Sequence, residues 1–202
     1  MHSHALEEIL PTLTKFSREF QQSEIMSGES REPAPASEEE KELKILDVGC
    51  GSGYLSAALG RLVDRGAQGP IHPLSTGRVF GIDVIPELVT LSRHNIMKAD
   101  SDLFTSGTVS VARGDGWNGL PSEGPFHAIH VGAAAETFPP SLMMQLYPHG
   151  GVMVIPVGAN NSIQNLYRVE RLRDSDHYDR DDFRIQNLLG VRYVPLVHSK
   201  MP

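Results

Sequence analysis

The stretch Leu46-Asp47-Val48-Gly49-Cys50-Gly51-Ser52-Gly53-Tyr54-Leu55 decides the fold of this chain. It continues an apolar run that begins at Ile45, and it opens a segment whose apolar residues have helical spacing. A strand that passes through a glycine turn into a helix is the opening unit of an α/β domain, with a ligand at the helix N-terminus. The dinucleotide pattern G-x-G-x-x-G would need glycine at position 54, which is tyrosine. The turn therefore predicts a smaller ligand whose charged group is not a pyrophosphate.

Alternating strand and helix patterns follow the turn. Short buried strands are expected at 79–83, 109–111, 128–131 and 152–157. Helices are expected at 54–63, 86–97 and 142–146. This alternation predicts a doubly wound, mostly parallel α/β sheet with helices on both faces. Two strand-like segments at 166–172 and 188–197 predict an antiparallel hairpin at the C-terminal edge.

Length and local composition predict a single domain over residues 1–202, since this length suffices for one core and is short for two. Near the N-terminus, the helical spacing of residues 5–10 is expected to be interrupted near Pro11, while Leu13, Phe16 and Phe20 fit an extension of the amphipathic pattern. Residues 21–42 hold few apolar side chains and predict a flexible insertion. We also expect an inserted loop at 64–78 and a charged loop at 174–182.

Composition and charge exclude several classes of protein. Eighteen Lys and Arg against 25 Asp and Glu give a net charge of −7, which argues against a protein that binds nucleic acid by neutralising phosphates. No apolar stretch approaches the ~18–20 residues of a membrane span, and residues 1–5 do not resemble a signal peptide. One cysteine, Cys50, excludes an internal disulfide framework, and the histidines form no metal pattern. We therefore expect a cytoplasmic protein without a metal, which binds neither nucleic acid nor a membrane.

Three aspartates follow three of the predicted strands. Asp47 ends the first strand, Asp83 ends the second, and Asp115 follows the third. Open α/β sheets bind ligands at this carboxyl edge, where an acid after the second strand accepts hydrogen bonds from ribose hydroxyls. Asp47 can hold an ammonium group or brace the turn, and Asp115 can reach an adenine amino group. S-adenosylmethionine carries adenine, ribose, ammonium and carboxylate groups, and it is the ligand that fits these residues.

Several strings resemble those of a known family. Leu46–Leu55 resembles the first motif of class I methyltransferases. More specific strings are together similar to the protein-L-isoaspartate (D-aspartate) O-methyltransferases, and the resemblance covers residues 1–10 and 44–197. These strings are Gly114-Asp115-Gly116, Ala128-Ile129-His130-Val131-Gly132-Ala133-Ala134-Ala135, Gln145-Leu146-Tyr147-Pro148-His149-Gly150-Gly151, Ile155-Pro156-Val157-Gly158 and Val191-Arg192-Tyr193-Val194-Pro195-Leu196.

The resemblance implies a Rossmann-like methyltransferase fold and a definite activity. Members of the family transfer a methyl group from S-adenosylmethionine to the free carboxylate of L-isoaspartyl or D-aspartyl residues, as a step in protein repair. The implied partner is a damaged protein or peptide, and a monomer is expected. A carboxylate is already a nucleophile at neutral pH, so the enzyme has to align the reactants and exclude water. The lack of an obvious His–Asp or Cys–His arrangement is consistent with this reaction.

The resemblance also assigns residues to the site. Cofactor-binding positions map onto Met1, Asp47, Gly49, Gly51, Ser52, Gly53, Asp83, Asp115, Gly116 and Val197. Substrate-binding positions map onto Gly132, Ala133, Ala134, Val191, Tyr193 and Val194. At the position of Val197 many members have a hydroxyl residue, and valine cannot make the corresponding hydrogen bond.

The N-terminus departs from the family pattern. The family carries a segment of the form T/S-x-S-x-P-H-M-H-A, and Met1-His2-Ser3-His4-Ala5 aligns with its end. The family's catalytic serine falls upstream of Met1 in this alignment, and Ser3 does not match it. We therefore assign no catalytic residue, and we expect weak cofactor binding and little or no turnover from these 202 residues. A record that starts at an internal methionine codon would explain the departure.

Two alternatives to isoaspartyl methyl transfer stay open. The first is a class I methyltransferase with another substrate, although the string at 191–196 and the net charge argue against it. The second is a catalytically impaired remnant that binds the cofactor and acts through protein contacts. Transfer of a labelled methyl group to an isoaspartyl peptide distinguishes these functions.

Overall fold

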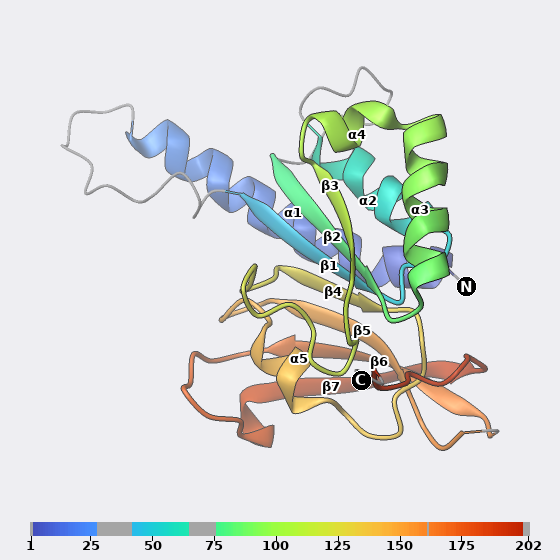
Figure 1. Ribbon diagram of the computed structural model, residues 1–202. Helices are drawn as coiled ribbons and strands as arrows, with labels where there is room; N and C mark the ends of the chain where they lie inside the picture. The colour runs from blue at the N-terminus through green and yellow to red at the C-terminus, as the bar shows by residue number, and fades with distance from the viewer. Residues whose placement is uncertain (1, 28–41, 65–75, 161, 200–202) are drawn as a thin grey trace.

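The computed structural model describes residues 2–27, 42–64, 76–160 and 162–199, and their strands form one seven-stranded sheet (Figure 1). The strands are β1 (Leu43–Val48), β2 (Gly77–Asp83), β3 (Val109–Arg113), β4 (Ala128–Val131), β5 (Val152–Val157), β6 (Gln164–Arg171) and β7 (Phe183–Val191). Their order across the sheet is β3-β2-β1-β4-β5-β6-β7. β1 to β5 pair in parallel, and β6 and β7 continue the sheet in antiparallel pairs. The predicted doubly wound sheet with an antiparallel C-terminal edge is confirmed.

Helices flank both faces of this sheet, but unequally (Figure 1). They are α1 (His2–Ser27), α2 (Tyr54–Val63), α3 (Pro86–Ala99), α4 (Ser101–Thr105) and α5 (Pro140–Met144). The first four pack on one face, where their apolar residues share a cluster with Ile45 and Val79. The short α5 covers the other face together with the segment that joins β3 to β4, and Leu46 and Ile129 lie in that second cluster. None of the described helices is long and apolar enough to span a membrane.

The central strands are apolar on both sides because both faces of the sheet are covered. Ile45 lies in the cluster beneath the long helices, whereas its neighbour Leu46 lies in the cluster beneath α5. This alternation explains why β1, β4 and β5 are near-continuous hydrophobic runs in the sequence.

The first helix differs from its prediction. It runs without interruption from His2 to Ser27 and contains Pro11. Ile9, Leu13 and Phe16 are buried against the sheet on both sides of that proline. Burial of this apolar stripe outweighs the hydrogen bond that proline cannot make, so the expected interruption near Pro11 is wrong.

The expected insertions overlap this helix and β2. Residues 21–27 belong to α1, and residues 28–41 lie outside the described part of the chain. Of the loop expected at 64–78, residues 65–75 lie outside the described part, and Gly77 already begins β2. The charged stretch 174–182 connects β6 to β7 and contains a 3₁₀ turn, Arg180–Asp182, in which the amide of Asp181 donates to the side chain of Asp179.

The last strand also differs from the sequence-based expectation. β7 spans Phe183–Val191, so the strand begins five residues before the expected segment 188–197. Its polar side chains Arg184, Gln186 and Asn187 are exposed, because β7 forms the edge of the sheet. The apolar residues 194–197 leave the sheet edge and return to the end of β4, where Pro195 bridges to Ala134.

Candidate functional site

A cavity of about 240 Å³ lies at the carboxyl ends of β1, β2 and β4. The strand order reverses between β1 and β4, and open α/β sheets bind ligands at such a point. The cavity wall comes from the glycine turn, the ends of β2 and β3, the loop after β4 and residues of the C-terminal segment, which comprises residues 194–199. Its residues are Val48, Gly49, Gly51, Ile82, Asp83, Val84, Ile85, Leu88, Gly114, Gly116, Gly132, Ala133, Val194, Pro195, Leu196 and Val197.

The glycine turn is held against β2 by backbone hydrogen bonds. The amides of Gly49 and Cys50 both donate to the carbonyl of Ile82, at 2.8 and 3.1 Å. Gly53 closes the turn with a left-handed backbone (φ 81°), and a Cβ there would lie 2.9 Å from that of Ser92 on α3. This glycine therefore serves the close packing of the turn on α3, whereas Gly49 and Gly51 line the cavity.

Asp83 is the charged side chain among the described residues that line this cavity. Its side chain is 6% exposed, and its two oxygens accept hydrogen bonds from the amides of Gly51 and Ile85 at 3.1 and 3.0 Å. A carboxylate has about four acceptor sites, so two bonds leave capacity for hydroxyl donors of a ligand. The position predicted for a ribose contact thus faces the cavity.

Asp47 does not line the cavity. Its side chain is 1% exposed and points to α2, where it contacts Ser56, and across the sheet to His130. Of the two roles expected for Asp47, an ammonium ligand or a brace of the turn, the geometry provides the brace. The direct contact of Asp47 with the cofactor stays a prediction, and in the structure each of its carboxylate oxygens accepts a hydrogen bond from inside the protein.

Asp115 binds the C-terminal segment. Its Oδ1 accepts from the amide of Trp117 at 2.9 Å, and its Oδ2 accepts from the amide of Ser199 at 3.0 Å. The imidazole of His198 lies 3.5 Å from Oδ2 and stacks on Trp117, with ring centroids 5.1 Å apart. Asp115 adjoins the lining residues Gly114 and Gly116, and its Oδ2 contacts this segment.

The C-terminal segment forms one wall of the cavity. The amide of Ala134 donates to the carbonyl of Val194 at 2.8 Å, and the amide of Leu196 donates to the carbonyl of Ala134 at 2.7 Å. Gly116 permits a close approach here, because a Cβ on it would lie 2.7 Å from side-chain carbons of both Leu196 and Val48. The predicted residues Gly132, Ala133, Val194 and Val197 meet Gly116 at this wall.

Other predicted site residues lie away from the cavity. Ser52 and Gly53 line a second hollow of about 270 Å³ between α2 and α3. Val191 pairs with Gln164 at the end of β7, and the amide of Tyr193 donates to the side chain of Gln164. Burial raises the pKa of the Tyr193 phenol. Met1 lies outside the described residues.

Sequence reasoning did not single out several apolar residues of the cavity wall. Ile85 and Leu88 follow Asp83 at the start of α3, and Leu196 lies in the C-terminal string. The signal for Ile85 and Leu88 was their position after the carboxyl end of β2, since loops at this edge surround the ligand. Leu196 could be placed only with the backbone bonds that return its segment to β4.

Cys50 is not a nucleophile in this structure. Its side chain is 7% exposed, and burial, with the charges of Asp47 and Asp83, raises the pKa of its thiol to about 12. A thiol in this state is protonated at neutral pH, and the thiolate is the reactive form.

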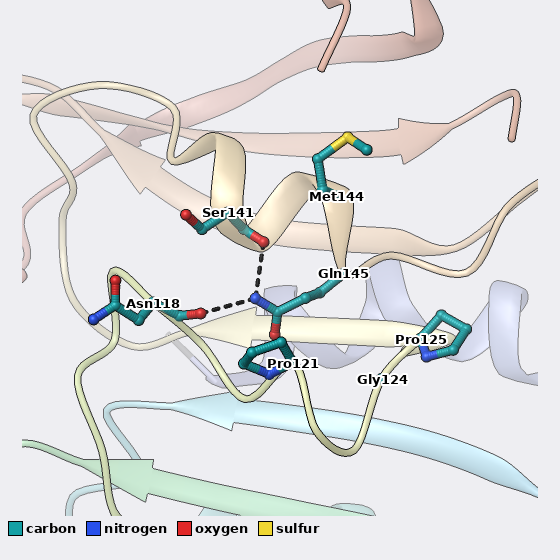
Figure 2. A pocket seen from close by; sticks show the side chains of 7 residues that line it. All are labelled: Asn118, Pro121, Gly124, Pro125, Ser141, Met144 and Gln145. Atoms are coloured by element: carbon teal, nitrogen blue, oxygen red, sulfur yellow. Dashed lines mark hydrogen bonds between the residues drawn. The ribbon is translucent and has the colours of Figure 1, made fainter. Parts of the chain in front are cut away.

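A wider hollow of about 650 Å³ lies beside α5 (Figure 2). Figure 2 shows the side chain of Gln145 on the wall of this hollow, with its amide nitrogen bonded to the carbonyls of Asn118 and Ser141, each at 2.8 Å. The side-chain oxygen of Gln145 accepts from the amide of Leu120 at 2.8 Å. These bonds brace the segment between β3 and β4 against α5, and the predicted site residues lie elsewhere.

Sheet topology, glycine turn and cavity together define a Rossmann-like methyltransferase fold. A Plasmodium falciparum protein described as a protein-L-isoaspartate O-methyltransferase in complex with S-adenosyl-L-homocysteine superimposes with a TM-score of 0.59. It is 25% identical, and the alignment covers 77% of this chain and 66% of that chain.

Residues 38–201 match the model of the family "Protein-L-isoaspartate(D-aspartate) O-methyltransferase (PCMT)", and the chain belongs to this family. A protein-L-isoaspartate O-methyltransferase of Aeropyrum pernix is 41% identical over 154 residues, which are 76% of this chain and 51% of that protein. The namesake from Triticum aestivum is 43% identical over 152 residues, which are 75% of this chain and 58% of that protein. The chain thus spans little more than half the length of these curated relatives.

Proposed function

We propose that this protein transfers the methyl group of S-adenosylmethionine to the free carboxylate of L-isoaspartyl or D-aspartyl residues in damaged proteins. The observation that carries the proposal is the cavity where the strand order reverses, which joins the glycine turn and Asp83 to the loop 132–134. Membership of the isoaspartyl methyltransferase family supports the same reaction.

The residues of the cavity fit this cofactor. Asp83 keeps acceptor sites for the ribose hydroxyls, and the absence of Cβ atoms at Gly49, Gly51 and Gly116 lets a ligand approach the backbone. Ile85, Leu88 and Leu196 offer apolar surface to an adenine ring. When bound, S-adenosylmethionine supplies a methyl group on a positively charged sulfur.

The chain's own residues would orient the two reactants and exclude water. The acceptor oxygen forms a bond to the methyl carbon while the bond from that carbon to sulfur breaks, and the sulfur keeps the electron pair. The products are a methyl ester and S-adenosylhomocysteine. No proton has to be removed from an ionised carboxylate, so alignment by the loop 132–134 and the C-terminal wall is the main contribution of the protein.

A labelled-methyl assay tests the proposal. The donor is S-adenosylmethionine with a tritiated methyl group, and the acceptors are one peptide with L-isoaspartate and the same peptide with aspartate. We expect label in the isoaspartyl peptide only, and at the low turnover that the sequence predicts for these 202 residues. Asp83→Asn should weaken the affinity for S-adenosylhomocysteine about 10- to 100-fold, because hydrogen bonds to a charged acceptor are lost.

Three outcomes count against the proposal. Label in a small molecule or a nucleic acid but in neither peptide would indicate a methyltransferase with another substrate. Cofactor binding without any transfer would indicate a protein that acts through contacts. Equal label in both peptides would exclude recognition of the isoaspartyl group.

The proposal includes a monomer in the cytoplasm that binds neither nucleic acid nor a membrane. The net charge of −7 supports the exclusion of nucleic acid, and a lone buried thiol, Cys50, supports a reducing compartment. Gel filtration of the natural protein measures its oligomeric state, and cell fractionation measures its compartment.

A further inference from the structure

A buried carboxylate joins three elements beside the cavity. Asp47 on β1 accepts a hydrogen bond at Oδ1 from Nδ1 of His130 on β4, at 2.8 Å, and at Oδ2 from Oγ of Ser56 on α2, at 2.5 Å. All three residues are at most 3% exposed. Because a carboxylate oxygen only accepts, Nδ1 of His130 carries the hydrogen. The Asp47 carboxylate is therefore enclosed in the protein, and its hydrogen-bond donors come from two other elements of the fold.

These partners flank both loops that line the cavity. Asp47 and His130 are opposite each other in the register of β1 and β4. Asp47 lies two residues before Gly49, and His130 lies two residues before Gly132. Ser56 lies in the first turn of α2, directly after the glycine turn. One carboxylate thus connects the strand before the turn, the helix after it and the strand before the second loop.

The two loops are also in close contact at Gly132. The amide of Gly132 donates to the carbonyl of Val48 at 2.7 Å. A Cβ on Gly132 would lie 2.8 Å from the carbonyl oxygen of Gly49 and 3.4 Å from Cε1 of His130. Close-packed interiors transmit small displacements, so a shift of the His130 ring moves Gly132 relative to Gly49.

We propose that His130 is a positioning residue for methyl transfer: through Asp47 and Ser56 it fixes the cofactor turn 49–53 relative to the acceptor loop 132–134. The inference rests on the proposed function, which assigns one reactant to each loop. In-line transfer depends on this separation, and a misplacement of about 1 Å can reduce a rate about 100-fold. Removing His130 would leave a buried carboxylate without one donor, and the strands would move to restore its solvation.

Four variants separate positioning from general stability. His130→Leu removes the donor, whereas His130→Asn offers an amide hydrogen near the place of Nδ1. His127→Leu is the matched control, because it removes another buried imidazole that precedes β4 and packs on Phe16 and Tyr147 instead. Ser56→Ala removes the second donor and serves if His130→Leu does not fold.

The first measurement is amide hydrogen exchange of the protein without ligand, over residues 47–56 and 130–136. For His130→Leu we expect exchange at both loops to accelerate about tenfold relative to the rest of the sheet, and for His130→Asn we expect most of the protection to return. His127→Leu should not change the two loops selectively. The second measurement is methyl transfer with both substrates saturating, where His130→Leu should lower kcat more than it raises the KM of the isoaspartyl peptide.

The outcomes distinguish this inference from the function on which it rests. Unchanged exchange and unchanged kcat in His130→Leu, in a wild type that methylates, would overturn the positioning role and leave the proposed function intact. A wild type that neither binds S-adenosylhomocysteine nor methylates would overturn the proposed function, and the reaction role of His130 with it. Equal effects in His127→Leu and His130→Leu would show that the contact between His130 and Asp47 contributes only to general stability. That result would overturn the positioning role.

Discussion

The imidazole of His127 is enclosed by aromatic rings. It stacks on Tyr147 at 4.5 Å and meets the edge of Phe16 at 4.7 Å, and its Nδ1 accepts the amide of Lys44 at 3.0 Å. Burial lowers the pKa of His127 from its ordinary value to about 4. The side chain is therefore neutral in the folded protein over a pH range in which it is charged in the unfolded chain.

This difference predicts a loss of stability in acid. Between pH 6.5 and pH 4 the unfolded chain binds a proton at His127 that the folded protein does not, so the free energy of unfolding falls as the pH falls. The full contribution is about 3 kcal/mol. Urea unfolding across this range should show a smaller loss for His127→Phe than for the wild type. The exposed His94→Gln should follow the wild type, and a parallel curve for His127→Phe would contradict the prediction.

The three aspartates show how far the role of a single residue can be predicted from the sequence. Each lies at or just after the carboxyl end of a parallel strand, and the sequence assigns each of them to the ligand. The structure leaves Asp83 at the cavity, turns Asp47 to His130, and turns Asp115 to the C-terminal segment. His130 lies 83 residues from Asp47 and Ser199 lies 84 residues from Asp115, and local sequence carries no information about such pairs.

Among the elements, α1 shows how packing overrides local preference. Ala5, Ile9, Leu13 and Phe16 form one buried stripe along it, and Pro11 lies on the exposed side. Proline lacks the amide hydrogen that would bond to the carbonyl four residues earlier. The helix tolerates this loss because the buried stripe stays packed against the sheet.

Replacement of that proline should therefore stabilise the protein. Pro11→Ala restores one helical hydrogen bond and removes a poor helix former, and we expect the free energy of unfolding to rise by up to about 3 kcal/mol. Urea unfolding measures the change. Arg18→Ala, on an exposed position of the same helix, should stay within about 0.5 kcal/mol of the wild type. A loss of stability in Pro11→Ala would mean that the proline fits a bend that the helix needs.

Elements with two buried faces are predictable to within a few residues, whereas the bounds of the edge strand β7 are not. β1, β4 and β5 are apolar runs because both of their faces are covered, and their places agree closely with expectation. β7 has mostly exposed side chains and lacks such a pattern. The apolar residues 194–197 were assigned to a strand because they resemble one, although they belong to the cavity wall.

At the scale of the whole molecule, the cavity is closed by a segment from the other end of the fold. Residues 194–197 follow the edge strand β7, yet they pair with Ala134 near the middle of the sheet. Gly116 lies between Leu196 and Val48 at this closure. Ligand affinity therefore depends on contacts between segments that are far apart in sequence.

Gly116→Val tests this closure. The added methyl groups would displace Leu196 and enter the cavity, so we expect a loss of about 1–3 kcal/mol in stability. S-adenosylhomocysteine at 100 times its Kd should stabilise the wild type by about 2.7 kcal/mol, and at that concentration it should not stabilise Gly116→Val. Ala112→Val adds methyl groups on an exposed position of β3 and should keep the ligand effect. Full stabilisation of Gly116→Val would contradict the closure.

The return of residues 194–197 to β4 has a consequence for biosynthesis. Domains begin to fold from the N-terminal side while translation continues. The glycine turn and Asp83 have left the ribosome long before Leu196 is added, but the wall that Leu196 completes does not yet exist. A nascent chain stalled before this segment emerges should fold much of its sheet and still fail to retain a nucleoside ligand. The protein therefore becomes able to bind its ligand late in synthesis and in a single step.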